Sequence, residues 1–377
     1  MEEAKYTVLS DLPPPTQNYK SDAITLTITI STKISFLRWV GPLLLTCAEN
    51  PNSTDFSHIL YLHQLDPPKL LSIYDPSSSI RDLAVLPSSN DIPNPSPSPI
   101  CDQAVYITDK SICIMELSHT NKVVKPIVGE SLLPYPPTSV CAHLKHPLLY
   151  VGCVDGTVLL LNNTLQIISL VKTNNAPIVK AIPSLELTHL FVSCSRGPSM
   201  LKVQTFLSPH PVNTIPLHIF MTDIFWDGHA VDPLIVGDAL GFVNVIDRSS
   251  AAVKAKKQAT FTRVKAHSSG CNAVDTFGSL VFSGGDDGRV VVFDKQRYHN
   301  RRKRKGAKTI HVLFKVMKEN GDVVVNEDVA ENEKQLEGYV LSDDDVRIVD
   351  LKINKKLEKI AIGVRKGVVL VKSLQTE

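Results

Sequence analysis

The stretch KAHSSGCNAVDTFGSLVFSGGDDGRVVVFD, residues 265–294, decides the fold. An Ala-His pair is followed by an apolar run around Ala273 and Val274, and a second run extends from Leu280 to Ser283. A Gly-Gly-Asp-Asp-Gly turn then leads into a third run that ends at Asp294. Such short runs between turn residues are typical of antiparallel strands. The stretch is either an isolated hairpin or one unit of a repeat. Similar runs elsewhere in the chain would favour the repeat.

This order resembles a WD40 repeat, in which a Gly-His pair opens and a Trp-Asp pair closes one four-stranded blade of a β-propeller. The resemblance implies that His267, Ser283 and Asp287 hydrogen-bond to one another inside the blade. Phe293 stands where the family has Trp, so the indole donor is missing. We therefore expect a partial structural network formed by His267, Ser283, Asp287 and Phe293.

Similar β-rich runs recur along the rest of the chain, and helical periodicity is almost absent. The segment VGCVDGTVLLL, residues 151–161, contains two such runs around an Asp-Gly turn. The last unit, residues 346–373, has only three runs, and the alternating segment AITLTITI, residues 23–30, can supply a fourth. The sequence therefore predicts an all-β fold, a seven-bladed WD40-like β-propeller closed by an N-terminal strand that completes the last blade.

The predicted organisation is an N-terminal extension, residues 1–22, followed by a single propeller, residues 23–377. The 377 residues are enough for seven blades of about forty residues each. Three flexible insertions are expected near residues 87–99, 297–308 and 318–345. The first is rich in proline and serine, and the third has ten acidic and two basic side chains.

The composition indicates a soluble, intracellular protein. Apolar residues make up 43% of the chain, and the net charge of +2 is too small to favour nucleic-acid binding over the whole surface. The seven cysteines never form a Cys-x-x-Cys pair, which favours a reducing compartment over a disulfide framework. No secretory signal and no apolar run near ~18 residues is present, so no membrane insertion is expected.

Catalytic motifs are absent from the sequence, so we expect no enzyme, no cofactor and no metal. Phosphate-binding, metalloprotease, nucleophile-elbow and kinase signatures are all missing. The Asp-Gly pairs at Asp155, Asp227 and Asp287 are interpreted as tight turns instead of catalytic carboxylates. One cluster of cysteines and histidines has two possible interpretations, a zinc site or buried core thiols with surface histidines. Its members are Cys141, His143, His146 and Cys153.

A run of five basic residues is the strongest functional signal outside the repeats. It consists of Arg301, Arg302, Lys303, Arg304 and Lys305. The run resembles a nuclear-import segment that an importin would bind, and the alternatives are contact with nucleic-acid phosphates and a solvated loop. Nucleic acid is expected to bind only through this loop, because no aromatic side chains alternate with its charges. The predicted location is the nucleus, with the cytoplasm as the alternative.

Ser342 precedes three consecutive aspartates, Asp343 to Asp345. This setting resembles the target of an acidophilic kinase, because such sites carry acidic residues after the serine. The alternative is a solvated turn before the last blade.

The start of the chain carries a second, shorter resemblance. The segment Lys33 to Trp39, which ends in Arg-Trp, resembles the first blade of the family of 43-kilodalton outer-ring nucleoporins of the nuclear pore Y-complex. The alternative is a strand end whose aromatic ring packs between blades. The resulting hypothesis is a non-enzymatic scaffold that binds protein subunits of a nuclear complex. A ribosome-biogenesis or chromatin factor and a peptide-reading receptor of a ubiquitin ligase remain alternatives.

Overall fold

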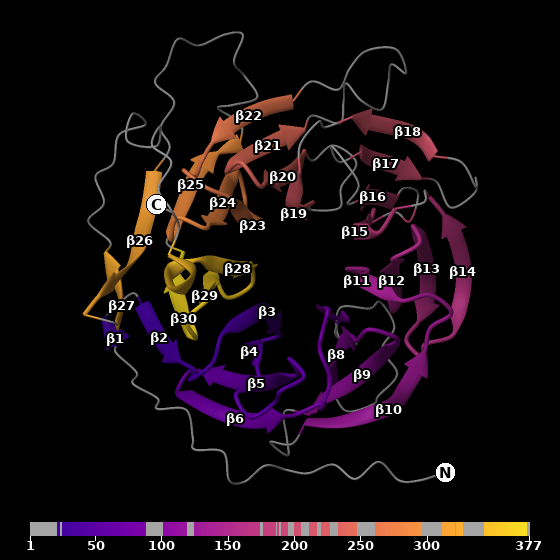
Figure 1. Ribbon diagram of the computed structural model, residues 1–377, viewed down its shortest axis with the longest axis horizontal. Helices are drawn as coiled ribbons and strands as arrows, with labels where there is room; N and C mark the ends of the chain where they lie inside the picture. The colour runs from indigo at the N-terminus through magenta and orange to yellow at the C-terminus, as the bar shows by residue number, and fades with distance from the viewer. Residues whose placement is uncertain are drawn as a thin grey trace.

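The strands form antiparallel sheets arranged around a common centre (Figure 1). The computed structural model describes residues 21–22, 25–87, 101–118, 124–173, 176–185, 187, 190–194, 200–204, 211–216, 220–226, 233–246, 261–295, 311–320, 322–326 and 343–374. Within these residues the strands belong to seven sheets, and the first strand of each sheet lies nearest the centre. The all-β propeller expected from the sequence is confirmed.

The sheets are numbered here in chain order. Sheet 1 contains β3 (Ile34–Val40), β4 (Leu43–Glu49), β5 (His58–Leu65) and β6 (Pro68–Tyr74). Sheet 2 contains β7 (Asp82–Val85), β8 (Cys101–Ile107), β9 (Ser111–Ser118) and β10 (Val124–Leu132). Sheet 3 contains β11 (Pro137–Ala142), β12 (Leu148–Cys153), β13 (Thr157–Asn162) and β14 (Ile167–Lys172). Sheet 4 contains β15 (Ile178–Pro183), β16 (Leu190–Cys194), β17 (Met200–Gln204) and β18 (Pro211–Pro216).

The remaining sheets follow the same order, with added strands at two of them. Sheet 5 contains β19 (Met221–Phe225), β20 (Leu234–Asp238), β21 (Phe242–Ile246) and β22 (Phe261–Lys265). Sheet 6 contains β23 (Cys271–Phe277), β24 (Leu280–Gly285), β25 (Arg289–Asp294), β26 (His311–Glu319) and β27 (Asp322–Asn326). Sheet 7 contains β28 (Ile348–Asn354), β29 (Lys359–Val364) and β30 (Val368–Ser373), preceded by the 3-10 helix η3 (Asp344–Val346).

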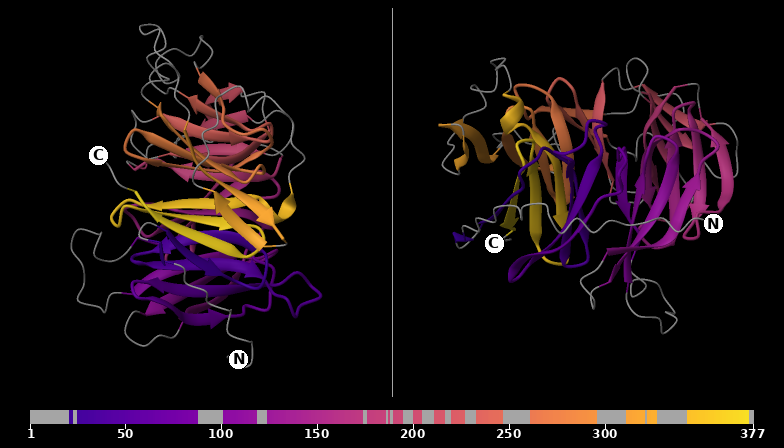
Figure 2. Two further views of the ribbon diagram at one scale, coloured as in Figure 1. Left: turned by 90° about the vertical axis from the view of Figure 1, so that its left-hand side faces the viewer. Right: turned by 60° about the horizontal axis from the view of Figure 1, so that its bottom comes forward.

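Sheet 7 also takes in strands from the start of the chain. Strand β2 (Thr25–Thr29) pairs with β30 in antiparallel register, from Thr25 opposite Lys372 to Thr29 opposite Val368. Strand β1 (Ser21–Asp22) pairs in turn with β2. The indigo β2 therefore lies beside the yellow sheet formed by the end of the chain (Figures 1 and 2). Two segments more than three hundred residues apart thus share one sheet.

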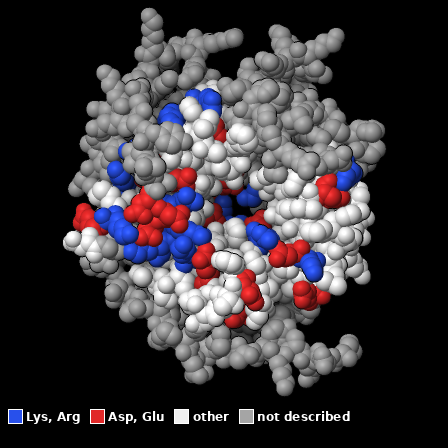
Figure 3. All heavy atoms as spheres, viewed as in Figure 1, with Lys and Arg blue, Asp and Glu red and all other residues white. Residues whose placement is uncertain are grey.

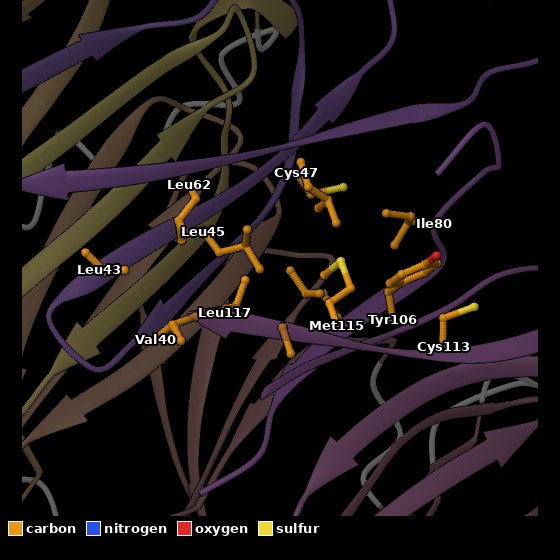
Figure 4. Packing of buried hydrophobic residues seen from close by; sticks show 13 residues of the cluster. Val40, Leu43, Leu45, Cys47, Leu62, Ile80, Tyr106, Cys113, Met115 and Leu117 are labelled. Atoms are coloured by element: carbon orange, nitrogen blue, oxygen red, sulfur yellow. The ribbon is translucent and has the colours of Figure 1, made fainter. Parts of the chain in front are cut away.

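Each sheet packs against a neighbouring sheet on both faces, and apolar side chains fill the spaces between them. Figure 4 shows the cluster between sheets 1 and 2, to which Leu45, Ile80 and Met115 contribute. Six more clusters of described residues join sheets 2 and 3, 3 and 4, 4 and 5, 5 and 6, 6 and 7, and 7 and 1. The cluster between sheets 7 and 1 includes Ile28, two residues each of β3 and β4, and Val369.

Glycines allow the inner parts of neighbouring sheets to approach closely. A Cβ atom added at Gly284 would collide with the Ile348 side chain of the next sheet, and one added at Gly152 would collide with Ile178. Both glycines lie on the second strand of their sheet, and both isoleucines begin the first strand of the next. The absence of a side chain at these positions therefore sets the spacing between sheets.

Part of the predicted flexible insertion near 318–345 is sheet instead. Strand β26 continues to Glu319 and pairs with β27, from Lys315 opposite Asn326 to Glu319 opposite Asp322. The three consecutive valines of β27 have strong strand preference, which outweighs the acidic residues around them. Residues 88–99 and 297–308 lie outside the described residues. No helix among the described residues is long and apolar enough to cross a membrane.

Candidate functional site

Three aspartates occupy the same position on the inner strands of different sheets. Asp82, Asp223 and Asp350 each accept a hydrogen bond from a backbone N–H on the inner strand of the next sheet. The donors are Val140 at 3.0 Å, Val274 at 3.1 Å and Leu37 at 2.9 Å. A buried carboxylate that accepts backbone N–H bonds is far less costly than an unpaired one. These aspartates therefore join sheet 2 to 3, sheet 5 to 6 and sheet 7 to 1.

Asp275 makes the equivalent contact between sheets 6 and 7. Its Oδ2 accepts a hydrogen bond from the backbone of Ile353 at 2.8 Å, and its Oδ1 accepts one from Thr276 at 2.7 Å. Burial raises the pKa of Asp275 to about 6, although Lys352 opposes the shift. Asp275 has no ion pair within 4 Å among the described residues, and desolvation therefore dominates.

Arg38 links two of these carboxylates. Its guanidinium donates to Asp350 Oδ2 at 2.8 Å and to Asp82 Oδ1 at 3.1 Å. Its Nε donates to the carbonyl oxygen of Leu83 at 2.5 Å. Burial alone would lower the pKa of Arg38, but Asp350 and Asp82 raise it above its ordinary value. One side chain of sheet 1 therefore holds sheets 7 and 2 together.

Two lysines continue the chain of charges around the centre. Lys352 Nζ lies 3.3 Å from Asp350 Oδ1 and 3.9 Å from Asp223 Oδ2, and Lys180 Nζ lies 2.8 Å from Asp223 Oδ1. Burial alone would raise the pKa of Asp223, but Lys180 and Lys352 lower it to about 2. Figure 3 shows charged side chains of both signs around the central opening. The six charged groups from Asp82 to Lys180 form one continuous ionic chain.

This ionic chain connects neighbouring sheets. Its three aspartates accept backbone N–H groups, as Asp275 does between sheets 6 and 7, while Arg38 and Lys180 are paired with carboxylates. A general base or a nucleophile needs a group that is free to reach a substrate. The geometry therefore supports a rigid frame at the ring centre.

The predicted network of sheet 6 has the following geometry. His267 Nδ1 lies 3.0 Å from Asp287 Oδ1, and its Nε2 lies 2.9 Å from Ser283 Oγ. Burial alone would raise the pKa of Asp287, but His267 and the N–H of Ser268 lower it to about 2. Phe293 is buried in the apolar cluster between sheets 5 and 6. The structure thus brings His267 and Asp287, from the connections before β23 and before β25, onto Ser283 of β24, and Phe293 packs in the neighbouring apolar cluster.

The four residues considered for zinc do not converge on a metal site. His143 Nδ1 accepts the N–H groups of Lys145 and His146, and its Nε2 lies 3.0 Å from the carbonyl oxygen of Ser184. Burial raises the pKa of Cys141 to about 11 and that of Cys153 to about 12, which disfavours the thiolate a metal needs. The described residues contain no group of three potential ligands.

Two predicted functional segments lie outside the residues that the structure describes. They are the basic run from Arg301 to Lys305 and Ser342. The aspartates of the ring centre were not predicted from the sequence. The signal was present as a recurring pattern of an apolar residue, any residue, Asp and an apolar residue, in IRDL (80–83), MTDI (221–224) and IVDL (348–351).

Comparison with known proteins supports the fold. A family model described as "WD domain, G-beta repeat" matches residues 256–294, which contain His267, Ser283 and Asp287. No curated protein matches the chain. The repeat match and the ring of sheets together support a WD40 β-propeller, a fold that generally mediates protein–protein interactions.

Proposed function

We propose that this chain is a non-enzymatic scaffold that holds protein subunits of a larger complex. The observation that carries the proposal is the ionic chain of the ring centre, where buried titratable groups hold neighbouring sheets together. A frame of this kind keeps the loops at fixed mutual positions, so that they form binding surfaces without changing the core. Function then resides in the loops and the rim.

The scaffold is proposed to be a closed, seven-bladed ring. The seven sheets would be its blades, and β2 would complete the last blade by pairing with β30. The apolar cluster between sheets 7 and 1, together with the Asp350–Leu37 hydrogen bond, supports closure at this point. Closure leaves no broad apolar sheet face exposed between the first and last sheets.

A nuclear complex is the proposed setting. The support is the basic run from Arg301 to Lys305, which has the composition of an importin-binding segment. The likeness of the Lys33 to Trp39 segment to outer-ring nucleoporins makes the nuclear pore one candidate complex. However, Arg38 and Trp39 also have a structural role, because Trp39 Nε1 donates to the carbonyl oxygen of Lys352 at 2.8 Å in the neighbouring sheet. Ribosome-biogenesis, chromatin and ubiquitin-ligase complexes remain alternative settings.

The test is purification of the tagged chain from its own cells, with mass spectrometry of the bound proteins and imaging of the tag. We expect a nuclear signal and a reproducible set of partner subunits. Replacing Arg301 to Lys305 with alanine should lower nuclear accumulation, because an importin binds the basic side chains of such a segment. A chain recovered without partners would contradict the scaffold, and an unchanged location of the alanine variant would contradict the import segment.

A further inference from the structure

A polar cavity of about 640 Å³ lies between sheets 1 and 2, away from the ionic chain of the centre. Three loops line it: residues 50–57 between β4 and β5, residues 75–79 between β6 and β7, and residues 108–110 between β8 and β9. Glu130 of β10 completes the wall. Its volume is in the range of pockets that hold small ligands or a few residues of a peptide.

The walls of the cavity are acidic and rich in oxygen acceptors. Four acidic residues and one basic residue line it; they are Asp55, Asp75, Asp109, Glu130 and Lys110. Most of the other lining residues carry hydroxyl or amide groups. An anionic ligand would be repelled by this wall, whereas an ammonium or guanidinium group needs acceptors for three or five N–H donors.

Two of the four carboxylates are held in place by the protein itself. Asp75 accepts hydrogen bonds from Asn50 Nδ2 at 3.2 Å and from the backbone of Ser77 at 2.7 Å. Asp109 Oδ1 lies 2.5 Å from Arg81 Nε in an exposed ion pair. The Asn50 and Ser77 contacts orient the Asp75 carboxylate, whereas the exposed Arg81–Asp109 pair adds little stability.

The other two carboxylates are available to a ligand. Glu130 is exposed and makes no hydrogen bond or ion pair with another described residue, and Asp55 is exposed with only the Thr54 hydroxyl near its carboxylate. Asp55 comes from the β4–β5 loop and Glu130 from β10, so the two exposed carboxylates reach the cavity from different elements. A basic side chain in this cavity would therefore meet two exposed carboxylates that pair with no basic side chain among the described residues.

An exposed aromatic ring beside the cavity indicates a peptide as the carrier of that basic group. Phe56 lies between the lining residues Asp55 and Ser57, and it is 79% exposed. Its backbone has φ of 55°, a conformation that non-glycine residues adopt rarely. A small free cation would cover little of this ring, whereas a peptide that extends from the cavity would bury much of its apolar area.

We propose that this cavity is a docking site for a lysine or arginine side chain in an extended segment of a partner protein, with Phe56 contacting a neighbouring residue of that segment. The proposal rests on the scaffold function and names the chemistry of one of its partners. Asp55 and Glu130 receive the basic group, while Asp75 and Asp109 add negative charge to the cavity wall.

The probe is a set of fluorescein-labelled nonapeptide mixtures whose central residue is fixed as Arg, Lys, Gln or Glu and whose other positions are randomised. Binding to the full chain is measured by fluorescence anisotropy at low and at high salt. We expect the Arg and Lys mixtures to bind about tenfold more tightly than the Gln mixture, a preference that corresponds to one charge-assisted contact. The preference should shrink as salt rises.

Two variants locate the binding to the cavity. The double substitution Asp55→Asn and Glu130→Gln should remove most of the preference for Arg and Lys, whereas Glu358→Gln, an exposed acid in the turn between β28 and β29, should leave it unchanged. Both changes affect exposed side chains, and equal melting temperatures will show that the fold is intact.

Equal binding of the Arg and Gln mixtures to the wild-type chain would overturn the proposal without any variant. A preference that survives the double substitution would place the basic site elsewhere and would also overturn it. These results are separate from a failure of the scaffold function, because partner subunits would still be recovered with the wild-type chain in that case.

Discussion

Replacing Arg38 by methionine should destabilise the ring more than any exposed substitution. Methionine keeps most of the aliphatic volume but removes the donors to Asp82 and Asp350, whose side chains are only 9% exposed. Removing one partner from a buried ion pair costs about 3–5 kcal/mol. Both carboxylates keep hydrogen bonds from the backbone, so we expect the low end, about 3 kcal/mol.

The assay is thermal unfolding, followed by circular dichroism at neutral pH. With an unfolding entropy of about 2.1 cal/mol/K per residue, a loss of about 3 kcal/mol lowers the melting temperature by about 4 °C for a chain of this length. The matched control is Arg81→Met. Its ion pair with Asp109 is more than half exposed, so its loss should cost less than about 1 kcal/mol and about 1 °C.

A triple variant separates loss of pairing from loss of packing. Adding Asp82→Asn and Asp350→Asn to Arg38→Met removes the two buried charges, and part of the lost stability should return. Equal melting temperatures for Arg38→Met and Arg81→Met would refute the role assigned to Arg38. A triple variant less stable than Arg38→Met would show that the carboxylates work mainly through their backbone contacts.

Three further predictions concern pH and packing. The pKa of Asp287 is lowered to about 2, so its carboxylate contributes about 2 kcal/mol of stability above pH 4, and this contribution is lost as the pH falls toward 2. Urea unfolding of the wild type should show this loss, and unfolding of Asp287→Asn should not. The pKa of Asp275 is raised to about 6, so stability linked to its protonated form is present below pH 4 and lost as the pH rises through 6. Asp275→Asn should therefore gain about 1 kcal/mol relative to the wild type between pH 5 and pH 7.5, and an unchanged difference would contradict the raised pKa. Gly284→Ala should cost about 1–3 kcal/mol by pushing against Ile348, and the double variant with Ile348→Ala should cost less than the sum of the two single changes; strict additivity would contradict a close contact.

The fold could be predicted because its main signals are local. Alternating apolar runs and Asp-Gly turns specify strands and hairpins without reference to distant residues, and residues 265–294 contain both. Strand β27 was missed because its valines lie within a strongly acidic stretch, where composition indicated a loop. Its pairing with β26 depends on a tertiary neighbour that a composition argument does not consider.

The ionic chain of the centre could not be predicted in the same way. Asp82, Asp223 and Asp350 recur at the same place in three sheets, but loops of unequal length separate them, so no fixed period reveals them. Their partners come from other sheets, since Arg38 meets Asp350 only when the two ends of the chain lie side by side. A single Asp in an apolar strand is a local anomaly whose meaning depends on its partners in neighbouring sheets.

The native mass of the tagged chain, isolated gently from its own cells at moderate salt and measured by mass photometry, tests the scaffold most directly. The scaffold account predicts particles much heavier than the 41.5 kDa chain, with a stable mass across preparations. A population at the mass of the single chain, under conditions that preserve other complexes from the same cells, would contradict it.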